Sequence, residues 1–302
     1  MTFNEGMDID PERVSTGGGM GPKMVLGGGG GLIVLVLALL FGVNPGDVVG
    51  NLTGGENKGQ SGAVDVSVCK TNSDANRYAQ CRVVLTAQSL DGVWGGQLPQ
   101  QTSRRYIRPE VKLFTGAIGT GCGNATSAVG PFYCPADRTT YFDTAFFQEL
   151  RDKFGASGGP LAEEYVVAHE FGHHIQNLLG DSGRAQRDPK GPESGSVRLE
   201  LQADCYAGIW ASYAAKTPAP GGSQPLLKPL TDKDIQDALS AAAAVGDDRI
   251  QKKATGRVNP EGWTHGSSAE RQQWFLAGYR TGQVRACDTF NAADLNNPPA
   301  LR

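Results

Sequence analysis

The strongest hydrophobic periodicity in the chain is helical and lies between Pro160 and Gly180. Apolar side chains recur there at intervals of three and four residues, namely Val167, Phe171, Ile175, Leu178 and Leu179. This interval predicts an amphipathic helix with one buried face. Pro160 suits the first turn of a helix, where its missing N–H costs nothing, and Gly180 is a typical residue just after a helix C-terminus.

Helical patterning returns in several other segments. Residues 197–215 are largely apolar, and residues 231–245 begin with acidic side chains, which favour a helix N-terminus. Ser267 and Glu270 form the S-x-x-E pattern of a capping box, which predicts a last helix that ends near Gly282. We also expect shorter helices at residues 71–85 and 146–154.

Signals for β-structure are confined to one stretch before the central helix. Residues 111–114 and 139–143 are rich in strand-forming side chains, so we predict a strand in each. Residues 116–128 are mostly small and predict a loop that contains Cys122. We expect the second strand to lie at the sheet edge beside the central helix, where an extended peptide could pair with it. The alternative for this strand is ordinary sheet structure.

The first part of the chain divides into three segments. Residues 1–23 are polar and rich in glycine and acids, which predicts disorder. Residues 24–43 carry no charge, and twenty helical residues just span a bilayer core of about 30 Å, so we expect an uncleaved membrane anchor. A cleaved signal peptide or a buried helix is the alternative. Residues 44–62 are predicted to be a linker, 63–290 a folded domain, and 291–302 a loose tail.

Charge and cysteine content refine this picture. A net charge of −3 gives no reason to expect a nucleic-acid partner. The six cysteines include no C-x-x-C pair, which favours disulfides and an oxidising compartment. Positive residues precede the apolar segment, so the domain is predicted on the periplasmic or extracellular side of a single-pass envelope protein. Pairing of sequence neighbours, the simplest of fifteen connectivities, gives Cys69–Cys81, Cys122–Cys134 and Cys205–Cys287.

The central helix carries a metal-binding pattern. His169, Glu170 and His173 form H-E-x-x-H, and two histidines four residues apart share one helix face. Two such imidazoles can hold one Zn²⁺ from the same side, while Glu170 reaches a water molecule beside the metal. A chance match is the alternative. His174 falls off that face and is predicted to be structural or solvent-facing.

A catalytic zinc ion needs a third protein ligand. Glu200 and Asp204 lie four residues apart on the next predicted helix, and E-x-x-x-D after H-E-x-x-H resembles the pattern of Glu-type zincins. By that resemblance Glu200 binds zinc, and Asp204 orients a ligand histidine. Asp204 as the ligand is one alternative, and two ordinary surface carboxylates are another. The apolar residues around both carboxylates argue against a surface role.

Four blocks of the sequence together resemble one family. They are residues 130–137, 169–176, 200–210 and 264–271, and they resemble the neutral zinc metallopeptidase family of bacterial envelope proteins. The resemblance covers roughly residues 62–290. It implies a zinc peptidase with an α+β, zincin-like fold, mostly helical, with a small antiparallel or mixed sheet beside the H-E-x-x-H helix and with disulfide bonds.

The expected function is zinc-dependent endopeptidase activity on peptide or protein substrates, with Glu170 as general base. His265, just before a predicted helix N-terminus, is the candidate second donor to the oxyanion, and a structural histidine is the alternative. Tyr133 and Tyr141 are weaker candidates. One rival function is a dedicated maturation enzyme or an inactive zinc-bound scaffold that binds partners. Another is a metal-free binding module.

Overall fold

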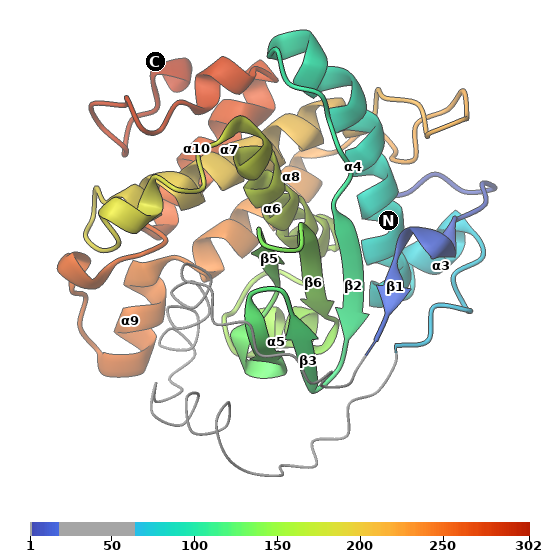
Figure 1. The fold of residues 1–302 in the computed structure, drawn as a ribbon, viewed down its shortest axis with the longest axis horizontal. Helices are drawn as coiled ribbons and strands as arrows, with labels where there is room; N and C mark the ends of the chain where they lie inside the picture. Colours follow the sequence, from blue (N-terminus) through green and yellow to red (C-terminus); the bar gives the residue numbers. More distant parts are fainter. Residues whose placement is uncertain (1, 18–63) are drawn as a thin grey trace.

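Helices form most of the structure and surround a small sheet (Figure 1). The computed structural model describes residues 2–17 and 64–302. The predictions of an anchor at 24–43 and a linker at 44–62 lie outside these residues. Within the two described ranges, no helix has both the length and the apolar character needed to span a bilayer.

The H-E-x-x-H helix, α6 (Pro160–Leu179), lies at the centre of the helical packing and ends at Gly180 in the left-handed conformation, as its sequence predicts. It packs against α4, α7 and α8, and α10 packs against α7. The remaining helices are shorter and lie nearer the surface. The bounds are α3 Asn72–Ala75, α4 Ala79–Gln101, α5 Ala145–Asp152, α7 Gly195–Ala214, α8 Asp232–Ala244, α9 Asp247–Thr255 and α10 Ser268–Thr281.

The helix predictions differ from the structure in two places. Helix α4 runs well past the predicted residue 85, although glycines and Pro99 lower its intrinsic helix propensity. Burial of its apolar face, including the fully buried Trp94, stabilises the longer helix instead. Helix α9 was not predicted, because its nine residues include only one buried side chain, Asp247, and so show no apolar stripe.

The sheet is mixed and has the strand order β1-β2-β6-β5. Strands β1 and β2 are parallel, β2 and β6 are parallel, and β6 and β5 are antiparallel. A separate antiparallel hairpin, β3–β4, occupies the region predicted to be a loop. The bounds are β1 Ser15–Thr16, β2 Glu110–Phe114, β3 Ala117–Thr120, β4 Gly123–Thr126, β5 Phe132–Cys134 and β6 Thr139–Asp143.

The predicted edge position of residues 139–143 is wrong. These residues form β6, which is hydrogen-bonded to β2 on one side and to β5 on the other. All five of its side chains are buried. A strand with both edges occupied cannot pair with a substrate backbone, because its N–H and C=O groups are already used. The edge strand beside α6 is β5.

Disulfides join the three pairs of sequence neighbours that were predicted. Cys69 is bonded to Cys81, Cys122 to Cys134, and Cys205 to Cys287. The first links the segment before α3 to α4, and the second ties the β3–β4 turn to β5. The third connects α7 to the segment that follows α10. Each closes a loop in the unfolded chain and stabilises the fold by about 2–4 kcal/mol.

Residues 2–17 and the C-terminal tail pack against the domain, whereas the sequence predicted disorder for residues 1–23 and a loose tail for residues 291–302. In the N-terminal segment, Phe3, Ile9 and Val14 are at most 6% exposed. Burial of such side chains contributes roughly 1.5–3 kcal/mol each, which offsets the cost of ordering a short segment. In the C-terminal tail, Leu295 is buried, and its carbonyl accepts a hydrogen bond from the Trp274 indole at 2.9 Å. Composition missed these segments because a few well-placed apolar side chains are enough to anchor them.

One of the N-terminal contacts has a pH-dependent consequence. The hydroxyl of Thr2 donates to Glu164, a fully buried residue in the first turns of α6. Burial raises the pKa of Glu164 to about 7, against hydrogen bonding from Thr2 and the charge of Arg82. A raised carboxyl pKa means that the folded state binds the proton more tightly than the unfolded chain. The stability that the protonated Glu164 carboxyl contributes to the fold is therefore fully present below the pKa of the unfolded chain. This stability is lost as pH rises through about 7.

We expect Glu164→Gln to remove this loss, since the amide cannot ionise and can still accept from Thr2. Between pH 4.5 and pH 8 the variant should gain stability relative to the wild type by on the order of 3 kcal/mol. Urea unfolding at both pH values measures the difference. Parallel stability curves for the two proteins would contradict the buried, protonated carboxyl.

Candidate metal centre

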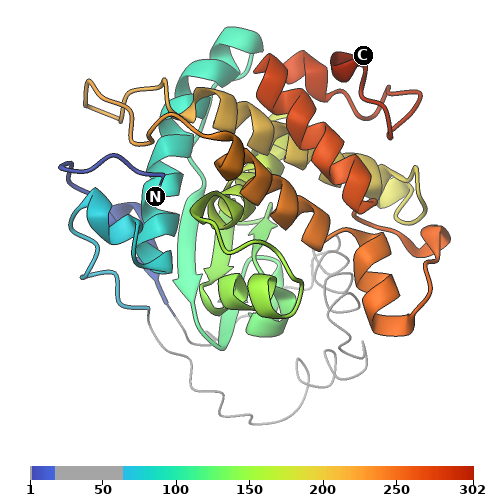
Figure 2. The same cartoon turned by 180° about the vertical axis from the view of Figure 1, so that it is seen from behind.

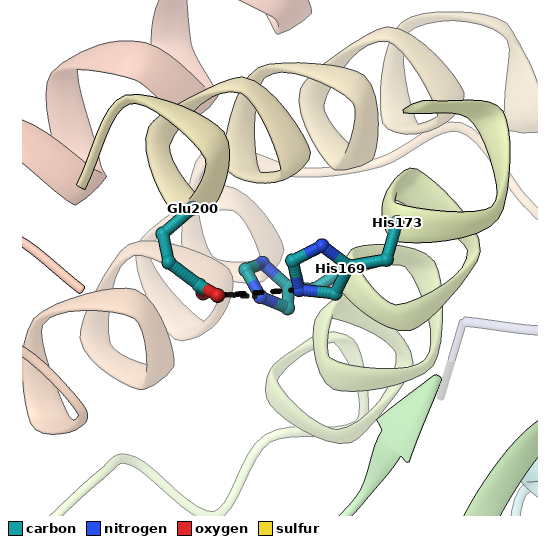
Figure 3. Close-up of side chains that lie close together, drawn as sticks. All are labelled: His169, His173 and Glu200. Carbon is teal, nitrogen blue, oxygen red and sulfur yellow. Dashed lines mark hydrogen bonds and ion pairs between the residues drawn. The ribbon is translucent and has the colours of Figure 1, made fainter. Parts of the chain in front are cut away.

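The two histidines of the motif project from one face of α6, as the spacing predicts. Their ring centroids lie 4.8 Å apart, and both Nε2 atoms face the carboxylate of Glu200 from α7 (Figure 3). His169 Nε2 is 3.1 Å from Glu200 Oε2, and His173 Nε2 is 3.5 Å from Glu200 Oε1. Two helices therefore bring two imidazoles and one carboxylate together at a single point.

Close packing of α6 and α7 makes this meeting possible. Gly172, between the two histidines, lies against the backbone of Ala203, and a Cβ at Gly172 would stand 2.8 Å from the Ala203 carbonyl oxygen. Only glycine permits such an approach without displacing a helix. Ala203 is itself three residues after Glu200 in α7. The glycine thus sets the distance across which the glutamate reaches the histidines.

The outer nitrogen of each imidazole has a fixed hydrogen-bond acceptor. His169 Nδ1 lies 2.8 Å from Asp204 Oδ1, and His173 Nδ1 lies 2.9 Å from Gln176 Oε1. The Gln176 amide is oriented by its own donation to the Leu199 carbonyl. Both acceptors hold a proton on Nδ1, so Nε2 of each ring faces Glu200 and is the atom that would bind a metal in place of a proton.

Asp204 is in turn surrounded by donors. Arg271 of α10 reaches its Oδ2 through Nε at 2.8 Å and its Oδ1 through Nη2 at 3.1 Å, and the Tyr165 hydroxyl also donates to Oδ1. The carboxylate is fully buried. Burial alone would raise the pKa of Asp204, but Arg271 and His169 hold it below its usual range. Asp204 therefore stays ionised and anchors the His169 ring.

The same charges act on two of the inner groups, His169 and Glu200. Burial alone would lower the pKa of His169, but Asp204 and Glu200 raise it to about 10. Burial alone would raise the pKa of Glu200, but the nearby histidines hold it well below its usual range. The cluster is thus strongly attractive to positive charge, a role that a proton or a divalent cation can fill.

The donor set fits zinc. One ligand atom from each of His169, His173 and Glu200 lies within 4.8 Å of the others, the one group of this kind within the described residues. Tetrahedral Zn²⁺ with bonds of about 2.0–2.2 Å requires neighbouring ligand atoms about 3.3 Å apart. Each imidazole lies at about this distance from one carboxylate oxygen, His169 Nε2 at 3.1 Å from Oε2 and His173 Nε2 at 3.5 Å from Oε1. Three protein ligands leave a fourth position for water.

Glu170 lies beside this cluster and is only 7% exposed. Burial raises the pKa of Glu170, while the charges of His173 and His169 oppose that shift. A raised pKa brings a carboxylate closer to the range in which it can both accept and donate a proton near neutral pH. The residue that the motif marks as the base thus has an environment suited to proton transfer.

His265 also approaches the cluster: burial alone would lower the pKa of its imidazole, but the charges of Glu200 and Asp247 raise it. Its Nδ1 lies 2.8 Å from the Thr264 hydroxyl and 3.6 Å from Asp247 Oδ1. The other Asp247 oxygen accepts the backbone N–H groups of Thr264, His265 and Gly266. Asp247 therefore fixes the loop that carries His265.

Three other residues considered from the sequence lie elsewhere. The Tyr133 hydroxyl is hydrogen-bonded to His174 Nδ1 and Asn177, and the Tyr141 hydroxyl donates to Asp137. His174 is fully buried, so its structural alternative is the correct one. Burial lowers the pKa of His174 to about 4, and the neutral ring joins α6 to Tyr133 and to the Ile107 carbonyl.

Sequence reasoning missed Gln176, Tyr165 and Arg271. Gln176 follows His173 by one helical turn, so helix geometry alone could have suggested it. Tyr165 precedes His169 by four residues and so lies on the same face of the helix. Arg271 is distant in the chain, and only the fold brings it to Asp204; its position next to Glu270 of the capping box gave no sign of this contact.

Comparison with known proteins identifies the family of the chain, and the family description names the metal that this donor set fits. The chain belongs to the family described as "putative neutral zinc metallopeptidase", whose sequence profile matches residues 3–290. It is 58% identical over 297 residues to the uncharacterized protein Rv2575 of Mycobacterium tuberculosis, covering 98% of this chain and 100% of that protein.

A more distant relative is the uncharacterized protein YpfJ of Escherichia coli K12. The two are 38% identical over 294 residues, which cover 95% of this chain and 96% of that protein. No solved structure matches the chain. The mixed α+β architecture with a small sheet and disulfides is therefore established from the structure itself, and the relation to the zincin fold stays a prediction.

Proposed function

We propose that the protein is a zinc-dependent endopeptidase. The observation that carries this proposal is the convergence of His169, His173 and Glu200 with a buried carboxylate, Glu170, beside them. A purely structural zinc site would close its fourth position and would have no use for such a carboxylate. The family name supports the same metal and reaction class.

The chain's own residues divide the work. His169, His173 and Glu200 would hold Zn²⁺, which supplies Lewis-acid activation and lowers the pKa of a water molecule to about 7. Glu170 accepts the proton of the attacking water and passes it to the departing amine. Asp204 and Gln176 keep both histidines in the tautomer that binds metal. Arg271 and Tyr165 hold Asp204 in place.

His265 is our candidate for the donor that stabilises the oxyanion of the tetrahedral intermediate. The support for this role is its proximity to Glu200 and its attachment to Asp247. A buried imidazole that pairs with a carboxylate is oriented before the substrate arrives, and orientation in advance is the main source of oxyanion stabilisation.

We expect His265→Ala to lower kcat about 10²–10³-fold while zinc content stays at the wild-type level. Steady-state kinetics with zinc analysis of the same samples measures both quantities. His174→Ala, which removes a buried histidine outside the cluster, separates loss of catalysis from loss of folding. Unchanged kcat in His265→Ala would leave His265 with a structural role.

The disulfides support an oxidising location, such as the cell envelope or the exterior. The second candidate function, an inactive zinc-bound scaffold, shares the metal but needs no Glu170. Zinc content and cleavage of a peptide library, each measured for the wild type and for Glu170→Gln, distinguish the two. An enzyme loses cleavage in the variant, and a scaffold shows none in either protein.

A further inference from the structure

The N-terminal segment, residues 2–17, is built into the same folded body as residues 64–302. Its first part pairs with the 225–228 segment, where Asn4 N–H donates to the Leu226 carbonyl and Lys228 N–H donates to the Thr2 carbonyl. Further along, Ile9 N–H donates to the Lys70 carbonyl at 3.0 Å. These are backbone hydrogen bonds to two separate parts of the domain.

The end of the segment joins the sheet. Ser15 and Thr16 form β1, which pairs in parallel with Lys112 and Leu113 of β2. Figures 1 and 2 show this end of the chain lying beside β2 and α4 from both sides of the molecule. The first strand of the sheet therefore comes from the segment that precedes residues 18–63 in the sequence, and the other strands come from the segment that follows them.

A buried ion pair fastens the same end. Arg13 Nε is 2.5 Å from Asp91 Oδ2 of α4, and the two side chains are 8% and 2% exposed. Arg13 also donates to the Pro109 carbonyl, and its guanidinium lies 5.9 Å from the centre of the Phe171 ring. Phe171 stands between the two histidines in sequence, so the segment braces the metal-binding helix as well as the sheet.

We propose that residues 2–17 are a permanent strap of the domain, and that they lie on the same side of any membrane as residues 64–302. The hydrocarbon core of a bilayer is about 30 Å thick and contains no partners for backbone polar groups. The strand pairing, the buried ion pair and the three buried apolar side chains of residues 2–17 cannot form with residues 64–302 if a bilayer separates the two parts. The proposal therefore differs from the sequence-based expectation of one membrane crossing at residues 24–43.

Thiol labelling of the full chain tests the proposal. All six native cysteines are in disulfides, so an introduced cysteine is the one free thiol. Glu5→Cys places it on the strap, and Lys252→Cys places it on α9, both at exposed positions. Spheroplasts that express each variant are treated with a membrane-impermeant maleimide, with and without detergent.

The proposal requires the two variants to behave alike. Labelling of both without detergent supports it and also agrees with an exported domain. Labelling of both only after detergent supports the strap but counts against the oxidising location proposed above. If one variant is labelled in intact spheroplasts and the other needs detergent, the two parts lie on opposite sides and the proposal is overturned.

Docking itself has an independent readout in amide hydrogen exchange of the purified full chain. Peptides that cover residues 2–17 should be protected, and Arg13→Glu should speed their exchange at least about tenfold by placing a second carboxylate beside Asp91. Glu12→Gln, at the neighbouring exposed position, is the control and should change nothing. Exchange of residues 2–17 at the unprotected rate in the wild type would overturn the proposal.

Discussion

Replacement of Glu170 by glutamine is expected to abolish peptide cleavage while the protein keeps its zinc. Glutamine has nearly the same shape but cannot accept a proton at neutral pH. The substitution should therefore slow the chemical step without changing zinc binding. General base catalysis contributes about 10²–10⁴-fold to a rate, and kcat should fall by that factor. Metal analysis and peptide cleavage measured on one preparation give both quantities.

A matched control lies in the same helix. Glu164 is also a fully buried carboxylate of α6, but it contacts Thr2 and not the metal ligands. Glu164→Gln makes the same chemical change and should keep the cleavage rate. Wild-type activity in Glu170→Gln would refute the proposed mechanism, since no other buried carboxylate beside the cluster is free of a ligand or support role in the described structure.

Replacement of Glu200 by alanine should instead remove the metal. Complete zinc sites contribute about 10–16 kcal/mol over four ligands, so one ligand is worth roughly 2.5–4 kcal/mol and zinc affinity should fall about 10²–10³-fold. Competition with a chelator of known affinity measures the change. Activity should fall in parallel and return in part at high zinc concentration, which distinguishes this variant from Glu170→Gln.

Glu193→Ala provides the control for Glu200→Ala. Glu193 precedes α7 and its side chain is 70% exposed, so its loss should leave zinc affinity unchanged. Thermal unfolding of the metal-depleted proteins shows whether Glu200→Ala still folds. Zinc affinity equal to that of the wild type would assign the third ligand to another group, and Asp204 would be the first to examine.

The sequence predicted those features that depend on local spacing. His169 and His173 could be placed together because the helical repeat fixes positions four residues apart. Glu200 and Asp204 were ordered as inner and outer groups by their resemblance to the Glu-type zincin pattern, and their otherwise apolar helix argued against a surface role. The disulfides followed from neighbouring cysteines, and the structure confirms all three.

Features that depend on tertiary packing were beyond such reasoning. Nothing local to residues 139–143 shows that strands will cover both sides of β6. Arg271 reaches Asp204 across 67 residues of chain, and only the packing of α10 on α7 brings them together. The prediction for the N-terminal segment failed for a related reason. Its few apolar residues stabilise a folded conformation only when they are buried against the domain, and the local sequence does not show that contact.

Helices α7 and α10 pack so closely that two facing glycines leave no room for a side chain. A Cβ on Gly208 would stand 2.0 Å from the Phe275 carbonyl oxygen, and one on Gly278 would stand 1.9 Å from that of Cys205. Any side chain at either glycine would act as a wedge and tilt α10 outward, carrying Arg271 with it. A single methyl group at either glycine, far from any reacting atom, would in this way weaken the support of His169 by Asp204 and lower the affinity of the site for its metal.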